Sequence, residues 1–274
     1  MGGDLEHPIR LTGAGQVAFA ATLIGLGIRG LVTRDFTAVW QPVPNGAPAR
    51  VLLIYLCAAI SLASGIGLLW RATAAIAARV LLAALVIWFL LWRVRALFLT
   101  SLVEGTWSCG ETMAMIAAAL VLCVAFASGK HKRNGVLLAR VLYALALIPF
   151  GYAHFAYIKH TADMVPAWLP WRFGWAYFTG ATFIAASAGI LFGVLPRLAA
   201  ALSALQMGLF GLLVWAPLIA KGPLNAFHQA EVATTLALTA AAWVVADSYR
   251  AAPWREAFGP LPLKTQSAQS SGPT

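Results

Sequence analysis

Three ionisable side chains in the second half of the chain have the types and spacing that proton-transfer chemistry needs. His228 and Glu231 are three residues apart, so on a helix they share one face, where the carboxylate can tune the imidazole or simply be hydrogen-bonded by it. His154 stands in an apolar stretch. Its imidazole can donate to a quinone carbonyl, act as a general base, ligate haem, or play only a structural part by bonding to a neighbouring helix. His154, His228 and Glu231 are therefore the candidate catalytic residues.

A second set of candidates follows His154 along the chain. Tyr157 is three residues further on and continues the face of His154 if both belong to one helix. Beyond it, residues 164–170 contain two prolines, which stiffen the segment and remove backbone donors, and a tryptophan typical of the membrane interface. Such a segment could roof a lipid-like ligand or only anchor the chain at the interface. The candidate ligand contacts are Tyr157, His160, Asp163, Pro166, Trp168 and Pro170.

Motifs for several other kinds of chemistry do not occur in the sequence. There is no serine-nucleophile elbow, phosphate-binding loop, HExxH or EF-hand pattern, and the three cysteines form no C-x-x-C pair. Haem held by His154 and His228 would need both imidazoles to face one interior, which their spacing does not show. We therefore predict no metal site. No cofactor-binding motif is evident in the sequence, and quinone is the candidate cofactor. Electrons for a redox step would come from a partner oxidoreductase subunit or a diffusible donor.

Composition identifies the environment that must position these residues. Of 274 residues, 61% are hydrophobic and only 10% are charged, and the mean hydropathy is +0.81. A soluble domain carries about a quarter charged residues, so we predict an all-α polytopic membrane protein in contact with lipid. The net charge of +10 is explained by topology and anionic lipid. No basic-aromatic module is present, and we predict no nucleic-acid partner.

Eight apolar blocks are long enough to cross a bilayer as helices, since a span needs about 20 apolar residues. The blocks are continuous rather than alternating, which excludes a β-barrel. The predicted spans are 11–31, 51–70, 72–92, 107–128, 136–158, 173–195, 198–220 and 227–246.

Basic residues predict the direction of these spans. The side that holds both termini carries more Lys and Arg residues than the other, including the compact cluster of Lys130, Lys132 and Arg133. Because cytoplasmic loops are enriched in Lys and Arg, we predict a multi-pass protein of the cell inner or plasma membrane with both termini cytoplasmic. Most of the ionisable residues near the spans then gather at the opposite end, among them Arg93 and Glu111 in the first half.

The two halves of the sequence resemble each other. When the two halves are aligned at one constant offset, Gly27 matches Gly151 and Gly30 matches His154. Later in the alignment the offset becomes shorter, and Glu111 then matches Glu231. Four helices in each half would make the repeats parallel, although chance similarity between Ala-rich helices is the alternative. The predicted units are a first four-helix repeat (1–128), a basic cytoplasmic linker (129–135), a second four-helix repeat (136–246) and a partly disordered cytoplasmic tail (247–274).

The second half resembles the DoxX-like family of four-helix membrane proteins over about residues 138–220. The matching features are Gly-Tyr-Ala-His-Phe at 151–155, the run 164–170, and Thr179-Gly180 leading into the Ala-Gly helix around Gly189. The first half would then be a degenerate copy that lacks the histidine. The resemblance implies a quinone- or lipid-facing membrane module, often acting with a partner, since some members look like membrane subunits of quinone-linked oxidoreductases.

Three functions follow from these patterns. The first is a DoxX-like membrane subunit or accessory factor of a quinone-linked oxidoreductase system, with the chemistry near His154 and His228. The second is a non-catalytic membrane scaffold or assembly factor. The third is a small-solute transporter, suggested by the duplication and weakened by the lack of matched Gly- or Pro-broken helices in the two halves. Whether the protein is an enzyme stays open at this stage.

Overall fold

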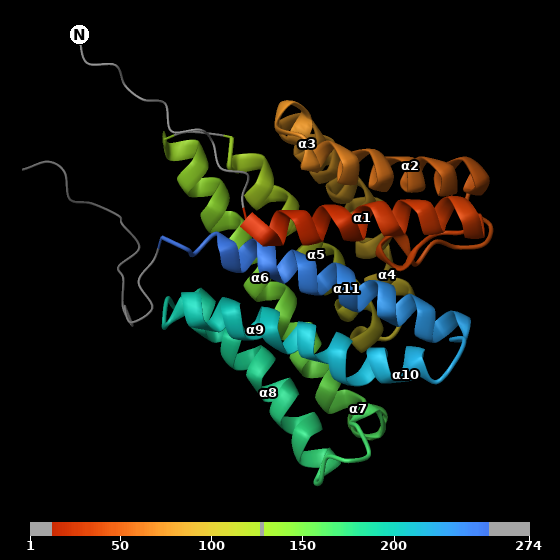
Figure 1. Ribbon diagram of the computed structural model, residues 1–274, viewed down its shortest axis with the longest axis vertical. Helices are drawn as coiled ribbons and strands as arrows, with labels where there is room; N and C mark the ends of the chain where they lie inside the picture. The colour runs from red at the N-terminus through yellow and green to blue at the C-terminus, as the bar shows by residue number, and fades with distance from the viewer. Residues whose placement is uncertain (1–12, 127–128, 252–274) are drawn as a thin grey trace, which may run out of the picture.

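The computed structural model describes residues 13–126 and 129–251, and their regular structure is entirely helical (Figure 1). The first half contains α1 (Gly13–Thr33), η1 (Ala38–Trp40), α2 (Arg50–Leu69), α3 (Arg71–Trp88), η2 (Phe89–Arg93), α4 (Val94–Leu99) and α5 (Leu102–Val124). The second half contains α6 (Gly129–Ala156), α7 (Ile158–Met164), α8 (Arg172–Leu191), α9 (Pro196–Phe210), η3 (Gly211–Trp215), α10 (Ala216–Ala220) and α11 (Ala226–Asp247).

The prediction of an all-α polytopic membrane fold is confirmed, because the described residues form eight helices long and apolar enough to cross a bilayer. The third span extends furthest beyond its predicted end. It runs on as α3, η2 and α4 through Arg71–Leu99, because the π-helical turn η2 carries the chain past the arginines that were expected to end the span. The predicted basic linker 129–135 is helical, since these residues form the first turns of α6. Most of the predicted tail lies outside the described residues.

The same order of helix packing occurs in both halves. In the first half α1 packs on α2, α2 on α3, and α3 on α5; in the second half α6 packs on α8, α8 on α9, and α9 on α11. The halves join where α5 packs on α6 and where α11 packs on α1 and α5. Each half also contains a π-helical turn in its third long helix, η2 and η3, followed by a short α-helix.

Two equivalent glycines bring the first two long helices of each half close together. A Cβ on Gly27 would stand 2.6 Å from the backbone nitrogen of Leu62, and a Cβ on Gly151 would stand 2.7 Å from the carbonyl oxygen of Gly180. Small residues at such crossings let membrane helices pack tightly. The predicted pair Gly27 and Gly151 therefore occupies matching positions.

The last helices of the two halves begin in the same way. Ser101 Oγ accepts the backbone N–H of Glu104 at 3.2 Å, and Asn225 Oδ1 accepts that of His228 at 2.8 Å. These N-caps preserve the constant spacing of the earlier pairs, which would align Glu111 with Thr235; the pairing of Glu111 with Glu231 stays a prediction. The duplication itself stays a prediction that the matched caps, glycines and π-helical turns support.

Helix α5 lies at the centre of the bundle because its small side chains allow close approach from several sides. Ala114, Ala117, Ala118 and Ala119 are fully buried in it. Of the residues in the most apolar stretch of α5, 67% are buried inside the protein. Large apolar side chains such as Leu52 and Phe98 point outward and are 67% and 81% exposed. This distribution suits a bundle whose outer surface faces lipid.

The first and last described helices meet at one end of the bundle. The backbone N–H of Gly15 donates to Asp247 Oδ2 at 3.3 Å, which fixes the start of α1 beside the end of α11, as Figure 1 also shows. An even number of spans places the start of α1 and the end of α11 on the same side of the membrane, because each pair of spans returns the chain to the side where it entered.

Candidate functional site

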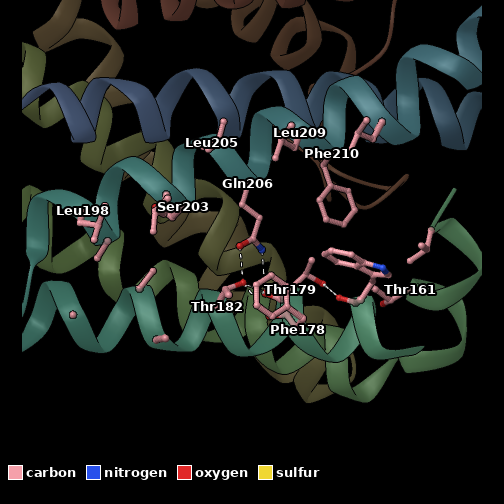
Figure 2. Close-up of a pocket in the computed structure, with 18 of the residues that line it drawn as sticks. Thr161, Phe178, Thr179, Thr182, Leu198, Ser203, Leu205, Gln206, Leu209 and Phe210 are labelled. Atoms are coloured by element: carbon pink, nitrogen blue, oxygen red, sulfur yellow. Dashed lines mark hydrogen bonds between the residues drawn. The ribbon is translucent and has the colours of Figure 1, made fainter. Parts of the chain in front are cut away.

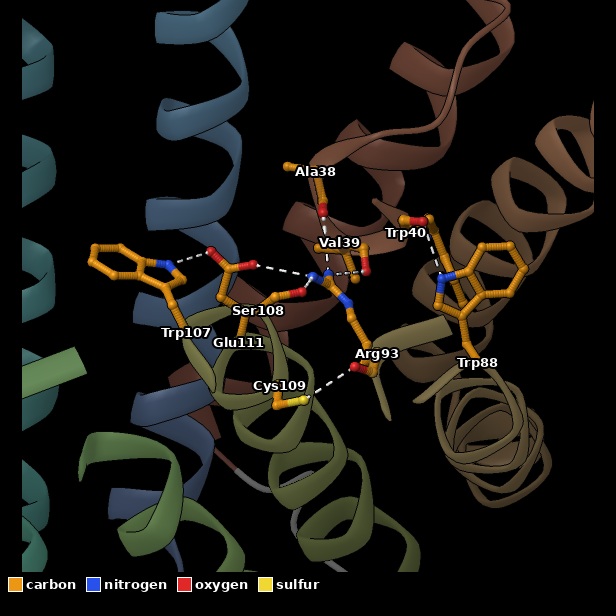
Figure 3. A network of polar contacts seen from close by, with 9 residues as sticks. All are labelled: Ala38, Val39, Trp40, Trp88, Arg93, Trp107, Ser108, Cys109 and Glu111. Carbon is orange, nitrogen blue, oxygen red and sulfur yellow. Dashed lines mark hydrogen bonds and ion pairs between the residues drawn. The ribbon is translucent and has the colours of Figure 1, made fainter. Parts of the chain in front are cut away.

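A buried ion pair links the third and last helices of the first half (Figure 3). Arg93 Nη1 lies 3.5 Å from Glu111 Oε2, and the two side chains are 2% and 18% exposed. Arg93 also donates to Ser108 Oγ and to the carbonyl of Val39 at 3.0 Å. A charged side chain at membrane depth is costly unless it is paired in this way, so the pair is a defined polar centre rather than a surface contact.

Local structure explains why Arg93 can face inward. It ends the π-helical turn η2, which shifts the register of the helix, and such turns are frequent at functional sites. Cys109 Sγ lies 3.4 Å from the Arg93 carbonyl and donates to it. The short helix η1 presents the carbonyls of Ala38 and Val39 to the guanidinium, and irregular backbone at this depth needs such partners.

A small cavity adjoins the ion pair. Arg93 Nε and Thr112 Oγ1 are both buried and have no hydrogen-bond partner among the described residues. Both residues, with Glu111 and Thr234, line a cavity of about 10 Å³, which is close to the space that one water molecule needs.

The polar centre continues into the second half through two aromatic rings. Trp107 Nε1 donates to Glu111 Oε1 at 2.8 Å, and the Trp107 ring stacks on the His154 ring with centroids 6.5 Å apart and planes 4° apart. A chain of contacts thus joins Arg93, Glu111, Trp107 and His154 across the boundary between α5 and α6. Sequence patterns placed Arg93 and Glu111 in a pool of charged residues but did not pair them, because their contact depends on how α5 packs beside η2.

His154 is 7% exposed and is held in a fixed orientation. Its Nδ1 lies 2.7 Å from the carbonyl of Phe150, and because a carbonyl only accepts, Nδ1 carries the hydrogen. Phe183 and Phe210 also contact the ring, with centroids 5.4 Å and 5.9 Å away. The neutral form would leave Nε2 as the acceptor.

The other two predicted catalytic residues do not form the expected pair. His228 lies near the start of α11 beside Trp215 and Phe227, with ring centroids 6.0 Å and 5.7 Å away. Among the described residues no ion pair joins it to Glu231. His154 and His228 have different ring neighbours, and the described residues contain no group of three or more His, Cys, Asp or Glu side chains that could hold a metal ion.

A large apolar groove lies between α8 and α9, roofed by α7 and the loop after it (Figure 2). Its volume is about 910 Å³. Of the predicted ligand contacts, Pro166 and Trp168 line it. Tyr157, His160, Asp163 and Pro170 are exposed and do not line it. Tyr157 lies just after the end of α6 at Ala156, so the expected uninterrupted helix through Tyr157 is wrong.

A short polar cluster interrupts the apolar wall of the groove. Gln206 Nε2 donates to the carbonyl of Thr179 at 3.0 Å, and Gln206 Oε1 lies 2.6 Å from Thr182 Oγ1, which donates to it. Figure 2 shows this cluster between Phe178 and Phe210. The second N–H of the Gln206 amide has no partner among the described residues. Gln206 was missed in the sequence because a single amide in an apolar helix carries no recognisable motif.

No family model matches the chain, and no match was found among curated proteins or solved structures. The resemblance to DoxX-like proteins therefore stays a prediction that rests on the quoted residues alone.

Proposed function

We propose that the groove between α8 and α9 binds an isoprenoid quinone and that the protein serves as a membrane subunit or accessory factor of a quinone-linked oxidoreductase system. The observation that supports this most is the groove itself, which combines a volume of about 910 Å³ with one polar cluster at Gln206. Ligand sites of this kind are mostly apolar, with a few polar groups that fix the orientation of the ligand.

The chemistry of the wall matches the two parts of a quinone. A quinone ring carries carbonyl acceptors, and the amide of Gln206, which lines the groove, has a second N–H besides the one that donates to Thr179. Phe178 and Phe210 line the same stretch and offer faces for stacking. Leu198 and Leu202, on the next turns of α9, line the groove toward the start of that helix, where an isoprenoid tail would lie.

His154 has an indirect part in this proposal. It contacts Phe210, which lines the groove, but it is not a lining residue itself. Its position joins the groove to the polar centre at Arg93 and Glu111 through Trp107. Only ring contacts join His154 to Phe210 and Trp107, so His154 positions these side chains and relays no proton. A partner subunit or a diffusible donor would supply the electrons for quinone reduction, and the aqueous phase the protons.

The experiment that tests the proposal measures quinone bound to the full chain. Protein purified in mild detergent is extracted, and quinone per protein is determined by liquid chromatography and mass spectrometry. We expect the wild-type chain to retain quinone and Gln206→Leu to lose most of it, because leucine keeps the volume and removes the donor. Thr22→Val is the matched control, since Thr22 only donates within α1 to Ala18. Equal quinone in wild type and Gln206→Leu would refute the proposal.

A second candidate function, transport of a small solute, is favoured by one observation. The π-helical turns η2 and η3 interrupt the third long helix of each half at matching places, and paired irregular segments at equivalent depths are typical of transporters built from repeats. Arg93 and Trp215 end these two turns. Flux of a solute into proteoliposomes that depends on Glu111 would support transport, and its absence across charged and neutral solutes would exclude it.

A further inference from the structure

Two deeply buried polar atoms beside the ion pair still need a hydrogen-bond partner. Nε of Arg93 and Oγ1 of Thr112 have none among the described residues, and both residues are only 1% exposed. The other two nitrogens of the guanidinium are used, because Nη1 lies beside Ser108 and Glu111 and Nη2 donates to backbone carbonyls of η1. Polar groups buried to this degree are nearly always bonded to protein or to ordered water.

The carboxylate of Glu111 is also incompletely bonded. Its Oε1 accepts the N–H of Trp107 at 2.8 Å, whereas its Oε2 has only the contact with Arg93 Nη1 at 3.5 Å (Figure 3). A hydrogen bond between a guanidinium and a carboxylate is normally about 2.7–2.9 Å long. Glu111 Oε2 can therefore accept a further donor.

These three groups belong to residues that line the same small cavity. Arg93, Glu111 and Thr112 contribute to its wall from the first half, and Thr234 contributes a hydroxyl from α11 of the second half. The cavity has a volume of about 10 Å³, which is about that of one water-sized sphere. A bound group must therefore be no larger than a water molecule.

The charges around the cavity favour a neutral occupant. Arg93 and Glu111 are the only charged residues among those that line it, and one guanidinium balances one carboxylate. A cation would be repelled by the first and an anion by the second. Water can accept from one group and donate to another, and a buried water typically makes two to four such bonds.

We propose that this cavity binds a single water molecule, which accepts the Nε–H of Arg93, donates to Oε2 of Glu111 and bonds to the hydroxyl of Thr112. The water bridges the long ion pair and completes its hydrogen bonding. Because Thr234 lines the same cavity, the water also connects the polar centre of the first half with the last helix of the second. The site is independent of quinone binding and stands if that proposal fails.

The first test uses the sign of a change in thermal stability. Thr112→Val keeps the shape of the side chain and removes the hydroxyl. If the hydroxyl bonds to a water, the full chain in detergent should unfold at a temperature lower by roughly 2–4 °C. If nothing satisfies the hydroxyl, the same change should raise the unfolding temperature, because it removes a buried polar group without a partner.

A matched control and a direct observation complete the test. Thr106 lies on the same helix, and its hydroxyl bonds only to carbonyls of α5, so Thr106→Val should unfold as wild type does. A crystal structure of the wild-type chain that resolves ordered water should show one water within hydrogen-bond distance of Arg93 Nε and Thr112 Oγ1. An unfolding temperature of Thr112→Val equal to or above that of wild type would overturn the proposal. An equal fall in Thr106→Val, or no density for water between the resolved side chains, would overturn it as well.

Discussion

The rings of Trp107 and His154 lie parallel across the boundary between the two halves, with planes 4° apart and centroids separated by 6.5 Å. Trp107 belongs to α5 and is bonded to Glu111, whereas His154 belongs to α6 and contacts Phe210 beside the larger groove. This stacked pair is therefore the link between the buried ion pair of the first half and the ligand groove of the second.

Removing the carboxylate from the ion pair should destabilise the protein strongly. Glu111→Gln leaves the guanidinium of Arg93 buried without a counter-charge, which typically costs about 3–5 kcal/mol. The double variant Arg93→Met/Glu111→Leu should cost less than the sum of the single variants. Thermal unfolding in detergent measures both effects. Asp35→Asn is the control, because its pair with Arg50 at 3.0 Å is 52% and 30% exposed and should contribute only about 0–1 kcal/mol; equal losses at the two pairs would contradict this account.

His154→Phe should keep the fold and keep bound quinone. Phenylalanine preserves the ring packing against Trp107, Phe183 and Phe210, and only the bond to the Phe150 carbonyl is lost, about 1 kcal/mol. Quinone content is measured in the purified variant as for wild type. Loss of quinone in a folded His154→Phe protein would mean that the imidazole itself contacts the ligand, contrary to its position behind Phe210.

The two glycine crossings should respond alike to larger side chains. Valine at Gly27 or at Gly151 would force apart helices whose backbones lie within 3 Å of the added Cβ, and overpacking of this kind costs about 1–3 kcal/mol or more. Gly25→Val is the control, since nothing lies within 4 Å of a Cβ there. Thermal unfolding of the three variants decides the matter: a stable Gly151→Val protein would remove one of the observations that support the duplication.

The orientation of the bundle can be read with reporter fusions. The predicted topology places the C-terminus in the cytoplasm, together with Lys130, Lys132 and Arg133. A fluorescent protein fused after the C-terminus should therefore fold and fluoresce, whereas alkaline phosphatase fused at the same place should be inactive. The reverse pattern would contradict the predicted cytoplasmic position of both termini.

Much of the frame could be predicted from the sequence because hydropathy alone determines which segments must span a bilayer. All eight spans were found, and the pairing of Gly27 with Gly151 pointed to two equivalent crossings. The π-helical turns were not predicted, because a π-helical turn changes the register of a helix without changing the apolar composition of the segment. Their effect is local but decisive, because η2 turns Arg93 inward.

The candidate site was predicted less completely. Pro166 and Trp168 do line the large groove, because a stiff, aromatic interfacial loop folds back over the helices that it connects. His228 and Glu231 share a helix, but among the described residues no ion pair joins them. Gln206 had no sequence signal, because its importance comes from Thr179 and Thr182 on a different helix. Spacing along one helix was therefore a poor predictor of side-chain contacts at the site, because those contacts depend on packing between helices.

The most direct test of the central claim uses a photoactivatable isoprenoid quinone analogue in liposomes that contain the full chain, with labelled residues located by mass spectrometry. The account predicts that the label falls on α8 and α9 around Phe178 and Phe210, that unlabelled quinone competes with it, and that Gln206→Leu reduces it. Labelling that spreads over lipid-facing side chains such as Leu52 and Phe98 and resists competition would contradict a quinone site in this groove.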